Sequence, residues 1–481
     1  MKGSEAMRIL YTASEALPYA ASGGLADVAG SLPAALCKAG HDCRVVLPLY
    51  KSVKQELRER LTFVKNFTVD VGWRKQYCGV FEGKENGVTY YLLDNEYYFA
   101  RDGLYGFYDD CERFVFLSRA VMELIGHIDW KPQVINCNDW QTALVPVYYQ
   151  TYYKFQHGYE DIKTVFTIHN IQYQGRYGMD VLNDIMGIPM YHAKLLEYDG
   201  AVNMMKGAFE TADKITTVSP SYAWEILDPW YSHGLDRALS GKQYKLCGFL
   251  NGIDTSLYDP EHDPVLPAHF TAADISGKAK CKEALLKNLG LAEGDDPVIG
   301  IITRFVSHKG IDLIKYVFND MLNLGCKFAI LGAGEKIFED FFKEMAWRRP
   351  DRVSVNLGFK PDLARQIYAG ADMFLMPSQS EPCGLAQMIS MRYGTLPVVR
   401  ETGGLRDSVR DAGGENGNGF TFKTYNAHDM LNAVNRAVEY YNNKDAWKKL
   451  VTDTMKNDFS WDNSAKLYIG LYRELAGNDD D

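Results

Sequence analysis

The feature of this sequence that most constrains its fold is a repeated alternation of short β-branched runs with stretches of helical periodicity. Strands that alternate with helices indicate βαβ units and mostly parallel sheets. Several runs are apolar on both faces, as in a sheet covered by helices on each side. We predict strands at Arg8–Thr12, Cys43–Pro48, Gln133–Asn136, Thr164–Ile168 and Lys214–Val218, and then at Val298–Thr303, Lys327–Leu331, Val353–Leu357, Met373–Met376 and Leu396–Val399.

The chain has 481 residues, which is too long for one compact core. Asn251–Asp254 and the following Pro-, Asp- and His-rich stretch Asp259–Ala273 separate the two series of strands. We therefore predict an α/β protein with two Rossmann-like, doubly wound domains, in residues 1–253 and 254–455. The remaining segment has helical periodicity up to Leu475, and an Asp-rich tail follows it.

Composition narrows the class of protein. Hydrophobic residues make up 46% and charged residues 24%, as in ordinary globular proteins, and the formal net charge of -10 argues against nucleic-acid binding. The nine cysteines are scattered without a C-x-x-C pair, which fits reduced thiols in a cytosol. The N-terminus lacks the apolar core of a signal peptide, and no window is apolar enough for a transmembrane helix. We expect a cytoplasmic protein that does not bind membranes, and its oligomeric state stays open.

Ligands of open α/β sheets bind beyond the carboxyl ends of the strands, so the residues there are candidates. In the first half, Gly23, Gly24 and Asp27 follow the first strand, where glycines let a ligand approach a helix N-terminus. The alternative is an ordinary strand-to-helix turn. Because no G-x-G-x-x-G follows that strand, a dinucleotide cofactor is disfavoured. Further along, Asp139 and the His169-Asn170 pair follow two other strands, where a neutral imidazole can bond a sugar hydroxyl; a structural histidine is the alternative.

In the second half, Arg304 and Lys309 follow the first predicted strand. Two fixed cations suit a diphosphate whose charge grows as a bond breaks; a solvated surface pair is the alternative. Glu381, Cys383, Gly384 and Leu385 follow another strand and open a helix whose free N–H groups suit a phosphate, although an acidic helix start is common in any case. Nothing around Cys383 indicates thiol chemistry. We predict no metal site, since acidic pairs such as Asp109-Asp110 fit turns or helix caps.

Taken together, these segments resemble the bacterial glycogen synthase and plant starch synthase family, over about Arg8 to Leu475. The segments that carry the resemblance are Ser22–Val28, Asn138–Leu144, His169–Gly175, Thr216–Pro220, Leu250–Asp254, Arg304 with Lys309-Gly310, Glu381–Leu385, Tyr393–Pro397 with Thr402–Leu405, and Asp458–Trp461.

The resemblance implies the GT-B fold, with two Rossmann-like domains facing each other across a cleft and a last helix, within residues 456–475, that packs back on the first domain. It implies transfer of glucose from ADP-glucose to the non-reducing end of an α-1,4-glucan, with retention and without a metal or other cofactor. Arg304 and Lys309 would hold the diphosphate, Glu381 and the amides of Gly384 and Leu385 would lie at the donor, and His169 would sit at the glucose. Asp139 and Asn251 would line the donor pocket.

Three features depart from the family pattern, and one of them, Ile389 where many related transferases carry a second Glu eight positions after the first, is usual for this branch. Ala21 stands where the family has Lys at the start of its glycine loop, and Gln379-Ser380 replaces Arg-Phe before Glu381. Two further interpretations follow: a transferase that uses UDP-glucose or another acceptor, and a glucan-binding paralogue with weak activity. The retained Arg304, Lys309 and His169 argue against the second.

Overall fold

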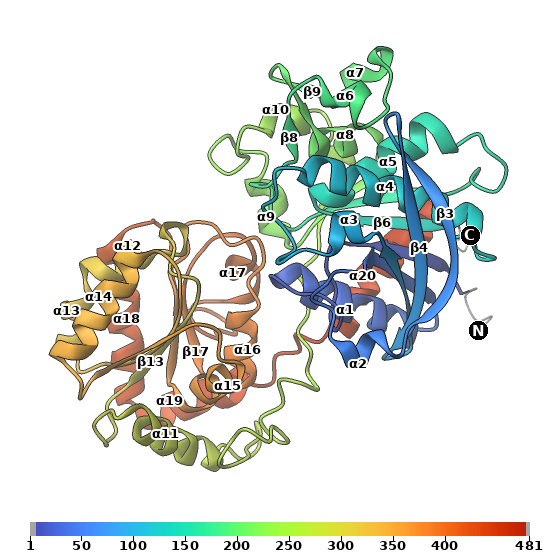
Figure 1. Ribbon diagram of the computed structural model, residues 1–481. Helices are drawn as coiled ribbons and strands as arrows, with labels where there is room; N and C mark the ends of the chain where they lie inside the picture. Colours follow the sequence, from blue (N-terminus) through green and yellow to red (C-terminus); the bar gives the residue numbers. More distant parts are fainter. Residues whose placement is uncertain (1–5, 478–481) are drawn as a thin grey trace. The chain divides into compact units, whose positions relative to one another are not determined.

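The computed structural model of the protein describes residues 6–477, so the first five residues of the first predicted domain and the end of the Asp-rich tail lie outside the described residues. The chain forms two compact units: a first unit of Met1–Gly252 with Trp461–Asp481, and a second unit of Ile253–Ser460. Figure 1 shows each as an α/β unit built around its own sheet. Within the described part of the chain, no helix is long and apolar enough to cross a membrane.

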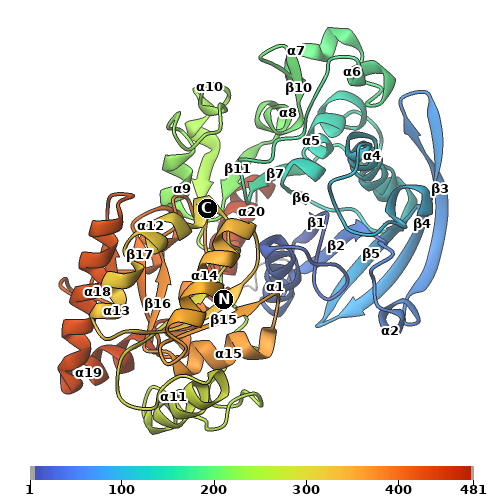
Figure 2. The same cartoon turned by 60° about the vertical axis from the view of Figure 1, so that its left-hand side comes forward.

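The first unit has a nine-stranded sheet in the order β12-β11-β7-β6-β1-β2-β5-β4-β3. Neighbouring strands from β12 to β5 run parallel, whereas β3 and β4 pair antiparallel at the outer edge, where Figure 2 shows them. The sheet strands are β1 (Arg8–Thr12), β2 (Asp42–Pro48), β3 (Thr62–Val71), β4 (Arg74–Glu85), β5 (Val88–Asp94), β6 (Val134–Asn138), β7 (Lys163–Ile168), β11 (Lys214–Thr217) and β12 (Leu246–Gly248).

A small antiparallel sheet of β8 (Arg176–Tyr177), β10 (Ala201–Asn203) and β9 (Glu197–Tyr198) completes the strands described for the first unit. Its helices are α1 (Gly24–Lys38), α2 (Gln55–Arg58), α3 (Glu96–Phe99), α4 (Asp110–His127), α5 (Leu144–Tyr148), α6 (Val181–Asp184), α7 (Ala193–Leu196), α8 (Met204–Thr211), α9 (Pro220–Glu225), α10 (Asp236–Leu239) and α20 (Trp461–Ala476).

The last helix, α20, belongs to the first unit although it follows the second unit in the chain. It begins at Trp461, packs on α1, and donates a hydrogen bond from the Tyr472 hydroxyl to Oδ1 of Asn136 on β6 (3.0 Å). Ser464 on the same helix bonds the carbonyl of Leu250 (2.6 Å). Buried polar bonds therefore fix this helix to the sheet that carries the N-terminal half of the chain.

The second unit has a six-stranded, fully parallel sheet in the order β15-β14-β13-β16-β17-β18. Figure 1 shows this sheet with α12, α13, α14 and α18 on one side and α15, α16 and α17 on the other, which is the doubly wound arrangement predicted from the sequence. The strands are β13 (Val298–Ile302), β14 (Lys327–Gly332), β15 (Val353–Leu357), β16 (Met373–Met376), β17 (Leu396–Arg400) and β18 (Phe420–Phe422). The helices are α11 (Ser276–Leu289), α12 (Ile311–Tyr316), α13 (Phe318–Asn323), α14 (Lys336–Arg348), α15 (Pro361–Gly370), α16 (Ala386–Arg392), α17 (Gly403–Ser408), α18 (Ala427–Asn442) and α19 (Lys444–Thr454).

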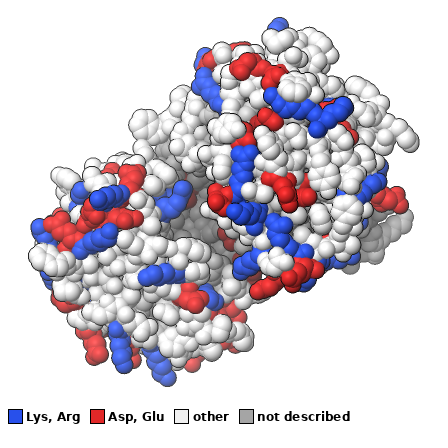
Figure 3. Space-filling view, viewed as in Figure 1, with Lys and Arg blue, Asp and Glu red and all other residues white. Residues whose placement is uncertain are grey.

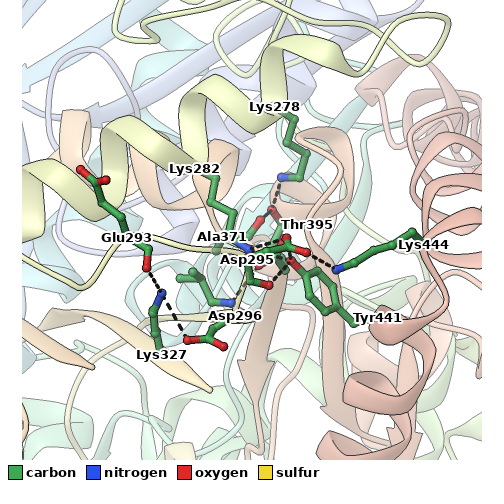
Figure 4. Close-up of polar contacts among 12 residues, drawn as sticks. Lys278, Lys282, Glu293, Asp295, Asp296, Lys327, Ala371, Thr395, Tyr441 and Lys444 are labelled. Carbon is green, nitrogen blue, oxygen red and sulfur yellow. Dashed lines mark hydrogen bonds and ion pairs between the residues drawn. The ribbon is translucent and has the colours of Figure 1, made fainter. Parts of the chain in front are cut away.

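Buried charges tie α11 to the amino ends of the strands in the second unit (Figure 4). Lys282 pairs with Asp372 (2.8 Å), whose carboxylate also accepts a bond from the backbone N–H of Val298 at the start of β13 (2.8 Å). Lys278 donates to the carbonyls of Ala369 and Tyr393 and to the Thr395 hydroxyl, and burial lowers the pKa of its amine to about 7. The charges of Lys278 and Lys282 at the amino edge of this sheet are thus satisfied by other groups of the chain.

The surface of the protein mixes both signs of charge. Figure 3 shows Lys and Arg interspersed with Asp and Glu over the face in view, without one continuous basic stripe. Nucleic-acid binding depends on clustered cations that neutralise phosphates, and this face shows no such cluster.

We predict that Asp372→Ala lowers the free energy of unfolding by about 3 kcal/mol, because the largely buried Lys282 amine loses its nearest carboxylate and keeps only the Tyr441 hydroxyl and the more distant Asp295. The matched control is Asp295→Ala, since Asp295 also lies near Lys282 (3.9 Å) but its side chain is 75% exposed. Exposed pairs contribute about 1 kcal/mol or less. Urea unfolding followed by circular dichroism measures both; equal losses in the two variants would contradict the assignment.

Candidate active site

In the first unit, a carboxylate organises the loop that follows β7. Asp139 comes directly after β6, and its Oδ1 accepts hydrogen bonds from the backbone N–H of His169 (2.8 Å) and of Asn170 (3.3 Å). Asp139 has φ 55° and ψ −179°, a backbone conformation that residues other than glycine rarely adopt. The structure therefore brings the predicted residues Asp139, His169 and Asn170 together, and it holds Asp139 in a strained backbone conformation to do so.

Burial controls the charge of these groups. It lowers the pKa of the His169 imidazole to about 3, so the ring is neutral at physiological pH. It raises the pKa of the Asp139 carboxyl to about 7, although the two backbone bonds act in the opposite direction. Two groups whose pKa values are shifted this far, at the carboxyl edge of a parallel sheet, are typical of a functional site.

The glycine loop after β1 begins beside a further carboxylate. Glu15 is buried and accepts a hydrogen bond from the backbone N–H of Ser22, and burial raises its pKa. A Cβ at Gly24 would meet no protein atom within 4 Å, and one at Gly23 would only touch Glu15 at 3.9 Å. Packing within the chain thus does not explain these two glycines, whereas the approach of a ligand to the start of α1 does. Asp27 lies in the first turn of that helix.

Asn251, next to the last residue of the first segment of the first unit, has an unsatisfied polar atom. The residue is buried, and its Oδ1 has no hydrogen-bond partner within the described residues. Buried side-chain acceptors in folded proteins are nearly always bonded. A bound molecule that donates a hydrogen bond would satisfy this Oδ1.

In the second unit, an ion pair joins two neighbouring strands at their carboxyl ends. The amine of Lys309, after β13, lies 2.7 Å from Oε2 of Glu381, after β16, and the Ser378 hydroxyl bonds the same oxygen (3.0 Å). Both side chains are largely buried, being 18% and 10% exposed. Arg304, by contrast, is exposed, and within the described part of the chain no carboxylate lies within ion-pairing distance of it. Lys309 is thus held in place by an ion pair, whereas Arg304 is available to an anion.

Glycines let the loop of Glu381 and the loop after β17 lock together. A Cβ at Gly403 would lie 2.0 Å from the carbonyl oxygen of Glu381, and one at Gly404 would lie 2.0 Å from that of Cys383. Gly404 donates its N–H to the backbone carbonyl of Glu381 (3.1 Å), and Gly384 has a positive φ of 71°. Cys383 is buried, and Leu385 is the residue that precedes α16. The segment 381–385 is therefore rigid, with its carboxylate and helix start in fixed positions.

A possible metal-ligand group lies at the start of the second unit. Ligand atoms of Asp259, Glu261 and His262 lie within 4.8 Å of one another. Asp259 is already paired with Arg392 (3.0 Å) and with His262 (2.7 Å), so its charge is compensated by the protein. Exposed acidic groups of this kind do not by themselves define a metal site.

In the first unit, which also contains Asn251, the structure places Gly23, Gly24 and Asp27 at the start of α1, and Asp139, His169 and Asn170 together after β6 and β7. In the second unit it places Arg304 and Lys309 after β13, and Glu381, Cys383, Gly384 and Leu385 after β16. Sequence analysis missed Glu15 and Ser378 as participants. A charged residue shortly after the apolar strand β1, which ends at Thr12, was the available signal for Glu15, whereas the bond of Ser378 to Glu381 depends on loop geometry.

Comparison with known proteins matches both units. Residues 8–241 match the family model of the starch synthase catalytic domain, and residues 284–452 match that of the glycosyl transferases group 1. A glycogen synthase of Bacillus cereus (strain B4264) is 47% identical over 474 residues, covering 98% of this chain and all of that protein. A glycogen synthase of Anoxybacillus flavithermus is 46% identical, with 98% of each chain covered.

Among solved structures, the catalytic domain of starch synthase IV from Arabidopsis thaliana, bound to ADP and acarbose, superposes with a TM-score of 0.90 at 34% identity over 98% of this chain and 100% of that chain. Sucrose-phosphate synthase from Thermosynechococcus elongatus shares the fold at 15% identity, with a TM-score of 0.63 and the same coverage. Two parallel-sheet units that carry these matches define a GT-B glycosyltransferase. Within that class, the chain belongs to the glycogen and starch synthase family of retaining glucosyltransferases.

The pKa of Asp139 leads to a prediction on stability. Because burial raises this pKa from 3.8 to about 7, the protonated carboxyl stabilises the folded state at low pH, and this stabilisation is lost as the pH rises through 7. We expect the melting temperature of the wild type, relative to Asp139→Asn, to be higher at about pH 5 than at about pH 8.

The matched control is Asp199→Asn, because Asp199 also has a positive φ (50°) but is exposed and pairs with Arg237 (2.9 Å). Its difference from the wild type is expected to stay constant between the two pH values. The assignment fails if Asp139→Asn behaves in the same way as this control.

Proposed function

We propose that the protein is a glycogen synthase that transfers glucose from ADP-glucose to the non-reducing end of an α-1,4-glucan, with retention of configuration. Identity of 47% to bacterial glycogen synthases along nearly the whole chain supports this activity. The observation that carries it is the pair Lys309–Glu381 at 2.7 Å, fixed at the carboxyl edge of the second sheet beside Arg304, which has no carboxylate partner among residues 6–477. Such an arrangement suits a reaction in which a nucleoside diphosphate leaves.

In the second unit, we assign the diphosphate to Arg304 and Lys309. Negative charge on the leaving phosphates grows as the bond to glucose breaks, and cations that are already in place stabilise it without reorganising. Glu381 holds the Lys309 amine by its Oε2, and its carboxylate also faces the sugar hydroxyls in this proposal. The amides of Gly384 and Leu385 at the start of α16 add donors for the phosphate.

In the first unit, we assign the glucose to the loop that Asp139 organises. The neutral His169 bonds a sugar hydroxyl, and its backbone carbonyl lies near the carbon that develops positive charge. Asn170 and Asn251 contribute polar contacts, and Asn251 then satisfies its buried Oδ1. Gly23 and Gly24 give the donor room at the start of α1, with Asp27 in that helix.

A nucleotide sugar and an α-glucan are the partners in this proposal. The starch synthase IV domain, which is 34% identical to this chain, was solved with ADP and acarbose. Ala21, at the exposed start of the glycine loop, takes the place of a family lysine and keeps UDP-glucose open as an alternative donor. We also propose that the enzyme works in the cytoplasm, where reduced thiols are stable, because none of its nine cysteines, all of them described, forms a disulfide.

We predict that Lys309→Ala and Glu381→Ala each lower turnover by at least about 100-fold, because each removes a fixed group from the leaving-group site. Radiolabelled glucose incorporated into glycogen measures this rate. Lys315→Ala is the matched control, since it removes an exposed lysine of the neighbouring α12 and should leave turnover within about 2-fold. Near-normal rates in both site variants would show that the leaving group binds elsewhere.

The donor can be identified by its effect on stability. A ligand that binds only the folded protein raises the melting temperature, and the rise grows with its affinity. We expect ADP-glucose to give a larger rise than UDP-glucose at equal concentration, and to give faster incorporation into glycogen. A larger rise and faster incorporation with UDP-glucose would favour the alternative donor.

A further inference from the structure

The imidazole of His169 is bonded inside the protein on one side only. Its Nε2 lies 2.8 Å from Oδ1 of Asn138, the last residue of β6. Within residues 6–477, no hydrogen bond of the other ring nitrogen, Nδ1, is found. The role of Asn138 therefore determines which nitrogen of His169 carries the proton.

The orientation of the Asn138 amide is fixed by its other neighbours. Its Nδ2 donates to the backbone carbonyl of Thr12 on β1 (2.8 Å), and its Oδ1 accepts from the Tyr11 hydroxyl (2.9 Å). If the amide were flipped, Oδ1 would face the Thr12 carbonyl, which has no hydrogen to donate. Asn138 is fully buried, so water cannot rescue such a contact.

It follows that Asn138 presents an acceptor to His169. An acceptor at this distance requires Nε2 to be the protonated nitrogen of the ring. Because burial keeps the imidazole neutral, Nδ1 then has a lone pair and acts as an acceptor. The ionisable groups bonded to this network are Asp139, which bonds the backbone of His169, and Tyr11, which bonds Asn138. Further out, Glu15 acts electrostatically on Asp139, and Tyr468 and Cys43 act on Tyr11.

We propose that Asn138 is a positioning residue that holds His169 as the Nε2–H tautomer, so that Nδ1 accepts a hydrogen bond from a hydroxyl of the donor sugar. The part of this inference that concerns the sugar rests on the proposed function, whereas the tautomer does not. An acceptor fixed in this way also selects its ligand, because a donor sugar that lacks this hydroxyl leaves Nδ1 unbonded.

The tautomer is measured directly by nitrogen-15 NMR on the full-length protein labelled at histidine. The signals of His169 are those that disappear in His169→Gln. We expect an unprotonated Nδ1 and a protonated Nε2 at neutral pH. A protonated Nδ1, or a charged imidazolium, overturns the proposal. Because this measurement needs no activity, it decides the tautomer even if the protein transfers no glucose.

The role in the reaction is tested by Asn138→Asp. A carboxylate next to Nε2–H stabilises the imidazolium and raises the pKa of His169, so that Nδ1 becomes a donor. We expect turnover to fall by about 10-fold or more near neutral pH and to recover as the pH rises and the imidazolium loses its proton. If the pH–rate profile of the variant runs parallel to that of the wild type, the proposal is wrong.

Asn136→Asp is the matched control. Asn136 lies two residues earlier on the same strand and is equally buried, but it bonds Thr167 and Tyr472 rather than His169. The same carboxylate there should lower the melting temperature while leaving the shape of the pH–rate profile unchanged. A recovery at high pH in both variants would mean that any buried carboxylate causes it, which also overturns the proposal.

Discussion

The parallel alignment of the strands is the constraint on which the candidate residues of each unit depend. Because all carboxyl ends of a parallel sheet lie at one edge, residues distant in sequence become neighbours there. In the first unit, the register that pairs Asn138 with Thr167 sets Asp139 beside the N–H of His169. In the second unit, adjacent β13 and β16 bring Lys309 to Glu381. Strand direction and register bring the loops that carry both contacts to the same edge of their sheet.

The two edges of the second sheet are electrostatically different. At the amino edge, Lys278 and Lys282 are surrounded by acceptors and by Asp372, so their charges are satisfied within the chain. At the carboxyl edge, Arg304 has no carboxylate partner in the described chain. In the proposed function, ligand binding falls at the edge opposite to the one that these buried pairs stabilise, so a change at one edge need not disturb the other.

The sequence predicted the fold class, since strands such as Val298–Ile302 are apolar on both faces and alternate with helices. It did not predict the antiparallel pair β3 and β4, because long strands with one exposed face, such as Thr62–Val71, lack the continuous apolar run of a buried strand. Motifs located Lys309 and Glu381 but gave no sign of their contact, which comes from loops that Gly403 and Gly404 allow to pack closely. The bond between Asn138 and His169 was equally invisible, because it depends on the register of β6 and β7.

The first unit is assembled from two segments that the whole of the second unit separates. Residues 253–460 form a contiguous chain, whereas β6 receives the Tyr472 hydroxyl only after α20 exists. During synthesis, the sequence of the second unit is therefore completed before that of the first, although N-terminal domains generally fold first. The second unit has its complete sequence before the ribosome has made α20. Until then, Asn136, on the sheet that carries His169, lacks its hydrogen bond from the Tyr472 hydroxyl. In a chain truncated before Trp461, the unit left incomplete would be the first one, although most of its residues are made first.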